Sequence, residues 1–299
     1  GFMGRNHRGR VIWQAIQLIT VGLAATLLYS ETNTLGDPGI GWHLKTGAEI
    51  WKQRAVPWSD PFGVSTQPWI HDQWLSDLLF HGVATVGRGA FRALVVLLIV
   101  GAWLWLPLRS MVRANETQPL SLLFALVLTL GMGCLQWFER PVLLSFACFA
   151  LMLAICRSVA EAPILKERQL LWLPGVFAIW ANLHPAVFLG LIALGVLQFE
   201  RVVFERSRVA AAVVMLSAVA TLFTPYGWQL HRSAVMLVSN RYFLDLNWEW
   251  ASPDAHQWLF LPFFTVVLLL LTAASRGAFR RVAAGELALV TVLLTMSLL

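Results

Sequence analysis

Long apolar runs separated by short polar segments dominate the sequence. They occupy about 11–30, 91–108, 119–137, 142–156, 170–182, 185–199, 209–224 and 257–273, and a further run extends from about 285 to Leu299. A helix needs roughly 20 apolar residues to cross the hydrocarbon core of a bilayer, and several runs reach that length only with flanking residues. The pattern predicts an all-α, polytopic integral membrane protein with about eight or nine transmembrane helices.

The composition supports this prediction and excludes other classes of protein. The chain is 58% hydrophobic and only 13% charged, whereas a soluble domain is about 45–50% apolar and about 25% charged. The net charge of +6 comes from Lys and Arg that lie singly or in pairs between the apolar runs. We therefore expect no nucleic-acid partner. The three cysteines have no zinc-site spacing and no glycine-rich nucleotide loop is present, so we expect neither a metal nor a cofactor.

The basic residues also predict an orientation. If the amino terminus is cytoplasmic, most of the 22 Lys and Arg fall in loops on the cytoplasmic side, as the positive-inside rule requires. This topology needs the segment 74–87, which contains Asp77 and His81, to be an interfacial helix rather than a span; if it spans, every later loop changes sides. We expect residues 1–299 to form one transmembrane domain of a bacterial inner membrane protein. Because the last run is still apolar at Leu299, we expect a longer parent chain.

The first outer loop, about 31–90, is unusually long and rich in polar residues. It contains the segments G-D-P-G-I-G-W-H-L-K-T-G-A-E-I, A-V-P-W-S-D-P-F and P-W-I-H-D-Q-W-L-S-D. Residues 42–52 place Trp42, Leu44, Ile50 and Trp51 among polar neighbours, which predicts an amphipathic surface helix. Asp37 follows the first span closely and is a candidate catalytic carboxylate, although Asp before Pro-Gly also simply caps turns. His71 and Asp72 are either an oriented pair or, as we expect, exposed loop residues.

Further charged residues stand at the outer ends of later spans. They lie in the segments Glu139-Arg140-Pro141, Asn182-Leu183-His184-Pro185, Thr224-Pro225-Tyr226-Gly227 and Asn247-Trp248-Glu249-Trp250. Charges near the apolar region are costly and are by default candidates for function. We expect these segments to converge on Asp37. The alternatives are a local ion pair between Glu139 and Arg140, and a hydrogen-bonded interfacial role for His184.

Taken together, these segments resemble those of a known group. The order Asp37, W-H-L-x-x-G, D-P-F, W-x-x-x-x-W-L, E-R-P, W-A-N-L-H-P, T-P-Y-G and E-W-x-S-P, from about Gly36 to Asp254, resembles a little-characterised group of bacterial multi-span proteins. That group is similar to the GT-C membrane glycosyltransferases, including enzymes like protein O-mannosyltransferases. The resemblance implies a GT-C-like fold whose long first outer loop carries interfacial helices, a lipid-linked sugar donor and an early acidic residue. Asp37 matches that residue by placement, but Pro38 stands where the best-known pattern has a second acid.

The resemblance leads to a hypothesis of sugar transfer from a polyprenyl phosphate to an acceptor on the outer, periplasmic face. Asp37 would be the base, with a pKa raised by an apolar wall. Arg140 would bind the phosphate. The other expected substrate-binding residues are Trp42, His43, Glu139, His184, Glu249 and Trp250, with Trp248, Arg232 and Arg241 as further candidates. Partners would be membrane lipid and a polyprenyl-phosphate-linked sugar.

Two other functions fit the sequence. One is a transporter or flippase of a lipid-linked substrate, although no internal repeat is evident and the ionisable residues lie mostly at span ends. The other is a non-catalytic structural or assembly subunit that binds further membrane subunits, which the missing second acid after Asp37 favours.

Overall fold

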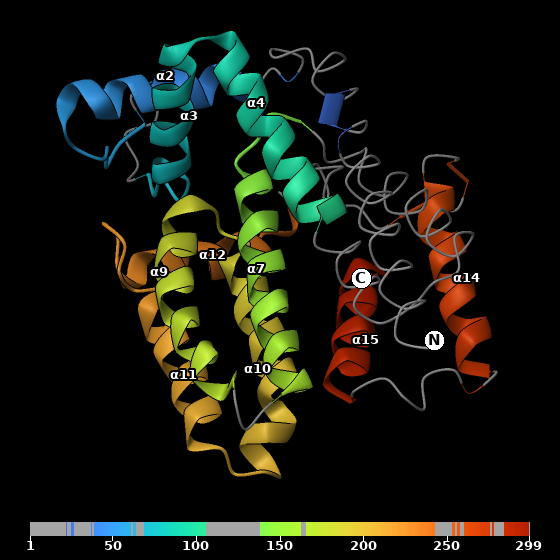
Figure 1. Cartoon of the computed structure of the whole chain (residues 1–299). Coiled ribbons are helices and arrows are strands. Elements are labelled where there is room, and N and C mark those ends of the chain that lie inside the picture. The colour runs from blue at the N-terminus through green and yellow to red at the C-terminus, as the bar shows by residue number, and fades with distance from the viewer. Residues whose placement is uncertain are drawn as a thin grey trace, which may run out of the picture.

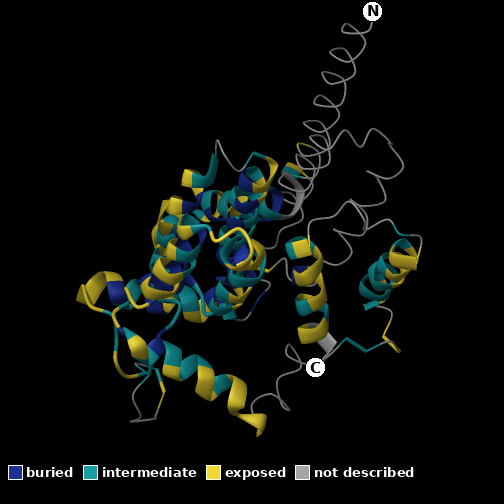
Figure 2. Ribbon diagram, turned by 90° about the horizontal axis from the view of Figure 1, so that it is seen from below, coloured by how far each residue is buried: buried dark blue, intermediate teal, exposed yellow. Residues whose placement is uncertain are grey.

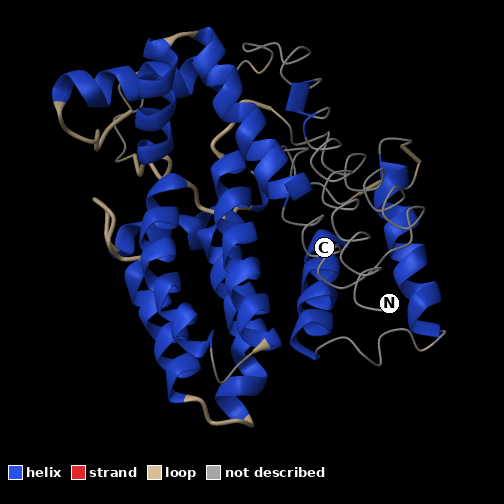
Figure 3. Ribbon diagram, viewed as in Figure 1, coloured by secondary structure: helices blue, strands red, loops and turns tan. Residues whose placement is uncertain are grey.

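The computed structural model describes most of the chain in several ranges. These are residues 37, 39–60, 62–63, 69–105, 138–162, 166–242, 253–254, 256–257, 260–275, 277 and 284–298, together with Gly22, Ala25 and Thr26. Within them the protein is all-α, and no strand is present in these ranges (Figure 3). The predicted fold class is therefore confirmed at this level.

The α-helices are α2 (Gly39–Gln53), α3 (Trp74–Val86), α4 (Arg88–Ile99), α7 (Val142–Glu161), α9 (Leu173–Leu183), α10 (Val187–Val203), α11 (Arg208–Ala220), α12 (Trp228–Ser239), α14 (Leu261–Ser275) and α15 (Ala284–Leu298). A π-helical segment, Val100–Trp105, continues α4, and a 3-10 helix, Glu167–Trp172, leads into α9. Figure 1 shows their arrangement.

Four helices, α7, α9, α10 and α11, form a bundle in which the chain runs alternately up and down (Figure 1). Their inward faces bury Met152, Phe177, Trp180, Leu194 and Val213 in one hydrophobic cluster. Figure 2 shows the buried positions gathered among these packed helices. In contrast, none of the described residues of α14 is buried. The bundle therefore supplies the rigid scaffold of the described structure.

A second hydrophobic cluster attaches α2, α3 and α4 to one end of this bundle. Ile40 of α2, Phe80 of α3 and Phe91 of α4 pack with Leu143 of α7 and with Leu183 at the end of α9. In Figure 1 these helices lie across the upper end of the bundle. We call this the α2–α3 end. The predicted helix over 42–52 is confirmed as part of α2, and α3 has only 13 residues.

The opposite end of the bundle carries a cluster of basic residues, and we call it the arginine end. Its basic residues are Arg157, Lys166, Arg168, Arg201, Arg206 and Arg208, which lie at the end of α7, before α9, and between α10 and α11. Glu167 accepts hydrogen bonds there from Arg201 Nη2 and Ser207 Oγ, both at 2.6 Å. The two ends of the bundle therefore differ in their charged residues.

The helices match the predicted runs in position better than in length. Among the described residues one helix, α7, with 20 residues, is long and apolar enough to cross a membrane by length and composition. The run 170–182 is divided, because Pro174 stands in the first turn of α9, where proline starts a helix but cannot continue one. The run 119–137 lies outside the described ranges, and only Gly22, Ala25 and Thr26 of the run 11–30 are described.

Candidate functional site

Most buried polar side chains of the described structure gather at the α2–α3 end. Asp37, His71, Ser76, Asp77, Glu139 and Asn182 are each less than a tenth exposed. A buried polar group costs free energy unless it is hydrogen-bonded, and a buried charge costs more. The partners of these groups therefore decide what this end of the protein can do.

Asp37 forms a buried ion pair with Arg140, which stands just before α7. Arg140 Nε donates to Asp37 Oδ2, Arg140 Nη2 lies 3.4 Å from Asp37 Oδ1, and the Gly39 N–H donates to Oδ1 at 2.8 Å. The capping role considered for Asp37 is thus present, because Gly39 is the first residue of α2. The ion pair ties the first loop to the start of α7.

The environment of Asp37 does not raise its pKa as expected. Burial alone would raise it, but the hydrogen bonds from Arg140 and Gly39 and the charges of Arg140 and His43 outweigh burial and hold the pKa of Asp37 below its usual value. The expected raised pKa was therefore wrong, because the sequence does not reveal that a guanidinium 103 positions away pairs with this carboxylate.

Glu139 is the second buried carboxylate beside this ion pair. Burial raises the pKa of Glu139, and the charge of Asp37 raises it further, whereas Arg92 of α4 lowers it. These effects place Glu139 within Coulombic range of Asp37 and Arg92. Glu139 and Arg140 thus both lie near Asp37, as expected if the outer segments converge on Asp37.

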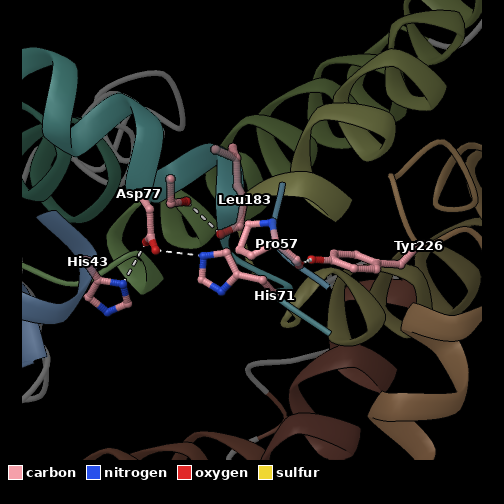
Figure 4. A network of polar contacts seen from close by, with 7 residues as sticks. His43, Pro57, His71, Asp77, Leu183 and Tyr226 are labelled. Carbon is pink, nitrogen blue, oxygen red and sulfur yellow. Dashed lines mark hydrogen bonds and ion pairs between the residues drawn. The ribbon is translucent and has the colours of Figure 1, made fainter. Parts of the chain in front are cut away.

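A fully buried carboxylate, Asp77 of α3, bridges two histidines (Figure 4). His43 Nδ1 of α2 lies 2.7 Å from Asp77 Oδ1, and His71 Nε2 lies 2.8 Å from Asp77 Oδ2. A carboxylate oxygen accepts hydrogen bonds, so the imidazole nitrogen that faces it is the donor in each pair. From this hydrogen-bond network we assign an N–H to Nδ1 of His43 and to Nε2 of His71.

The bridge exists because α2 and α3 approach unusually closely at Gly47. A Cβ at Gly47 would lie 2.1 Å from the carbonyl oxygen of Asp77 and 2.7 Å from His81 Cβ, so only glycine fits. Gly47 follows His43 by one helical turn, on the same face of α2. The close contact therefore holds His43 against the α3 residue that orients it.

Asp72 and Tyr226 form the neighbouring part of the site. Burial raises the pKa of Asp72 to about 6. Tyr226 comes from the turn before α12, and its hydroxyl donates to the carbonyl oxygen of Pro57 at 2.7 Å (Figure 4). Burial, together with the smaller effect of the Asp72 charge, raises the pKa of Tyr226 to about 12. Tyr226 therefore stays protonated and fastens the first loop to this turn.

The turn between α9 and α10 completes the site from the bundle side. Asn182 Oδ1 accepts from Trp74 Nε1 at 2.9 Å, and Ser76 Oγ donates to the Leu183 carbonyl oxygen at 2.6 Å, so α3 docks on the end of α9. His184 Nδ1 accepts from the Ala186 N–H at 3.1 Å. Burial, together with the smaller effect of the His43 charge, lowers the pKa of His184 to about 4. His184 is thus neutral at physiological pH and lies near His43.

Aromatic side chains line the first-loop side of the site. Trp42, which is 40% exposed, packs edge-to-face on Phe62 and Trp69 with ring centroids 4.9 and 6.0 Å apart, and Trp69 lies 4.5 Å from the His71 ring. Trp58 packs edge-to-face on Tyr226 at 4.9 Å. Exposed aromatic faces beside buried charges suit the binding of an amphipathic ligand.

The structure brings five of the eight predicted site residues into one connected region. Asp37, His43, Glu139, Arg140 and His184 interact there by hydrogen bonds or by Coulombic effects on pKa. Trp42 is attached through Trp69. Glu249 and Trp250, with Trp248, lie outside the described residues. Arg232 and Arg241 are exposed and have no contact with the site among the described residues.

Sequence reasoning missed the centre of the site. Asp77 was noted only as a residue that makes a span improbable, and His71 and Asp72 were expected to be exposed, whereas His71 is 4% exposed. The sequence does show that His43 and Gly47 are four positions apart, which places them on one face of a helix. What the sequence does not show is which helix α3 meets.

Within the described ranges no group of three or more His, Cys, Asp or Glu side chains is arranged to hold a metal ion. Comparisons of this chain with protein-family models, with curated proteins and with solved structures yield no match.

Proposed function

We propose that this protein is a polytopic membrane glycosyltransferase of the GT-C type, with about eight or nine spans, in a bacterial inner membrane with a cytoplasmic amino terminus. It would transfer a sugar from a polyprenyl phosphate to an acceptor on the periplasmic face. The observation that carries the proposal is the meeting of four distant segments, around Asp37, Asp77, Arg140 and His184, in one buried, charged region at one end of a helical bundle.

The surface of the bundle supports a lipid environment. Large apolar side chains point outward along α9 to α12, among them Ile179, Ile192, Phe199, Met215, Leu216, Val219, Val235 and Met236. Apolar patches of this extent are uncommon on soluble monomers. The basic residues of the arginine end would then face the cytoplasm, in agreement with the positive-inside rule, and the α2–α3 end would face the periplasm.

The roles of the ion pair follow from its geometry. The Arg140 side chain is about one third exposed, whereas Asp37 is buried, so Arg140 can be reached from solvent and Asp37 cannot. A guanidinium binds phosphate through paired donors, which suits the phosphate of a polyprenyl carrier. Asp37 then serves to hold Arg140 in place, because its lowered pKa makes it a poor proton acceptor at neutral pH. Trp42 offers an exposed ring for the sugar.

Binding of undecaprenyl phosphate to the purified protein in lipid nanodiscs tests the proposal. Charge-assisted hydrogen bonds contribute about 1.5–3 kcal/mol, so Arg140→Ala should weaken binding about tenfold or more. Arg157→Ala, at the arginine end, is the matched control and should leave affinity unchanged. Undecaprenol, which lacks the phosphate, should bind wild type and Arg140→Ala equally.

Equal affinity of undecaprenyl phosphate for wild type and Arg140→Ala would overturn the proposal. It would favour a non-catalytic assembly subunit in which the Asp37–Arg140 pair only joins two segments. Transport of undecaprenyl phosphate across the bilayer of proteoliposomes, without sugar transfer, would favour a flippase.

A further inference from the structure

Among the described residues, His43 has an accessible ring nitrogen that no hydrogen bond engages. Its side chain is 17% exposed, and its Nδ1 is committed to Asp77. Within the described part of the chain no hydrogen bond engages Nε2. Because Asp77 places the proton of neutral His43 on Nδ1, Nε2 carries a lone pair. An imidazole held in this way by a carboxylate has the geometry of a general base.

Asp37, His71 and His184 each lack a free lone pair on an accessible atom. Asp37 is paired with Arg140. His71 is 4% exposed and donates to the same carboxylate as His43. His184 uses its Nδ1 lone pair to accept from the Ala186 N–H, so its remaining nitrogen is a donor. Of Asp37 and these three histidines, His43 is therefore the group with a free lone pair on an accessible atom.

We infer that His43, held by Asp77, is the proton acceptor of this site, an assignment that rests on the proposed function and replaces Asp37 in that role. The acceptor hydroxyl gives its proton to His43 Nε2 as its oxygen forms a bond to the anomeric carbon. The bond from that carbon to the phosphate oxygen breaks, and its electron pair leaves with the phosphate. The proton later passes from His43 to solvent.

Asp77 and His71 are positioning residues in this scheme. Asp77 stabilises the imidazolium that forms on His43, as buried carboxylates do in hydrolase triads. His71 occupies the second oxygen of Asp77 at 2.8 Å and packs against Trp69, so the carboxylate cannot turn away from His43. The close contact at Gly47 holds the two helices that carry the pair.

Turnover of undecaprenyl phosphate mannose, used as the probe donor, tests the role of His43. We expect His43→Ala to lower kcat about 10²–10⁴-fold, the usual contribution of a general base, while undecaprenyl phosphate binding is retained and added imidazole restores part of the rate. Asp77→Asn should also act on kcat rather than on KM. His256→Ala removes a histidine that also lies beside an aspartate, 3.0 Å from Asp254, but is exposed, and it should leave turnover unchanged.

A second measurement does not need turnover. The ¹⁵N NMR shifts of histidine-labelled protein report which ring nitrogen carries the proton. We expect Nδ1 in His43, and a shift toward the other tautomer in Asp77→Asn. Diethyl pyrocarbonate, followed by mass spectrometry, should modify His43 and spare buried His71.

The outcomes separate the two proposals. Phosphate binding without turnover in the wild type would overturn the transferase proposal and with it the catalytic role of His43. Wild-type turnover that survives His43→Ala would overturn the role of His43 alone. A proton on Nε2 of His43, or no change of tautomer in Asp77→Asn, would overturn the assignment of the oriented lone pair whatever the turnover.

Discussion

The two ends of the helical bundle both carry acid–base pairs, but they bury them differently. At the arginine end Arg157 and Glu161 lie 3.6 Å apart on one helix face, and both are 46% exposed. At the α2–α3 end Asp77 is fully buried between two histidines, and Asp37 is buried beneath Arg140. Exposed pairs contribute about 0–1 kcal/mol, whereas a buried charge that loses its partner costs about 3–5 kcal/mol.

The difference shows that the protein buries charged groups at the α2–α3 end, although stability alone does not require their burial. Buried ion pairs are often replaceable by apolar residues without loss of stability. The α2–α3 end nevertheless keeps two acids, Asp37 and Asp77, out of water, next to groups with shifted pKa values. Such clusters are typical of functional sites. The arginine end has the exposed Arg157–Glu161 pair and the partly buried Arg201–Glu167 pair, and neither of their acids is fully buried.

The largest expected effect comes from removing the bridging acid. Asp77→Ala leaves two imidazole N–H groups without an acceptor, and we expect a loss of about 2–4 kcal/mol in the free energy of unfolding. Glu161→Ala, at the arginine end, should cost less than about 0.5 kcal/mol. Denaturant unfolding in detergent micelles measures both. Equal losses would show that the two ends do not differ in the way described.

The next effect tests the helix contact that builds the site. Gly47→Ala places a methyl group against the backbone of Asp77 and should destabilise the protein by about 1–3 kcal/mol. Gly41→Ala is the matched control, because it lies on the same helix with no atom within 4 Å of its added Cβ. Alanine should stabilise α2 at that position by about 0.5–1 kcal/mol. A melting temperature below that of the wild type for Gly47→Ala, and above it for Gly41→Ala, would confirm the contact.

A smaller effect should be similar at both ends. Ser76→Ala removes the hydrogen bond to the Leu183 carbonyl, and Ser207→Ala removes the N-cap of α11, where Ser207 Oγ accepts from the Ala210 N–H. Each should cost about 1 kcal/mol. A harmless Ser76→Ala would contradict the docking of α3 on α9. If melting experiments show equal losses of stability for Ser76→Ala and Ser207→Ala, the two ends differ in their charged groups and not in their neutral hydrogen bonds.

The smallest effect is a pH dependence in which two groups oppose each other. The pKa of Asp72 is raised to about 6, so its contribution to stability falls as pH rises from about 4 to about 6. The pKa of His184 is lowered to about 4, so its contribution falls as pH drops from about 6.5 to about 4. Asp72→Asn should therefore make stability rise more steeply with pH in this window, and His184→Gln should do the reverse. Melting temperatures measured from about pH 4 to about pH 6.5 test this. If both substitutions changed the pH dependence of stability in the same direction, these assignments would be refuted.

The sequence predicted the helical class and much of the site, but not how the site is connected. Apolar runs locate helices such as α7 and α10 because burial of apolar surface is encoded locally. Asp37, Arg140 and His184 stand out because charges at the ends of apolar runs are costly. The partner of Asp37 and the bridging role of Asp77 depend on contacts across 103 and 34 positions. No local pattern carries that information.

The most direct test of the central claim is an electron cryomicroscopy map of the protein with undecaprenyl phosphate in a nanodisc. The account predicts phosphate density against the Arg140 guanidinium, with the Nε2 edge of His43 facing the same space. Phosphate density at the arginine end, beside Arg201 or Arg208, with the α2–α3 end unchanged, would contradict it.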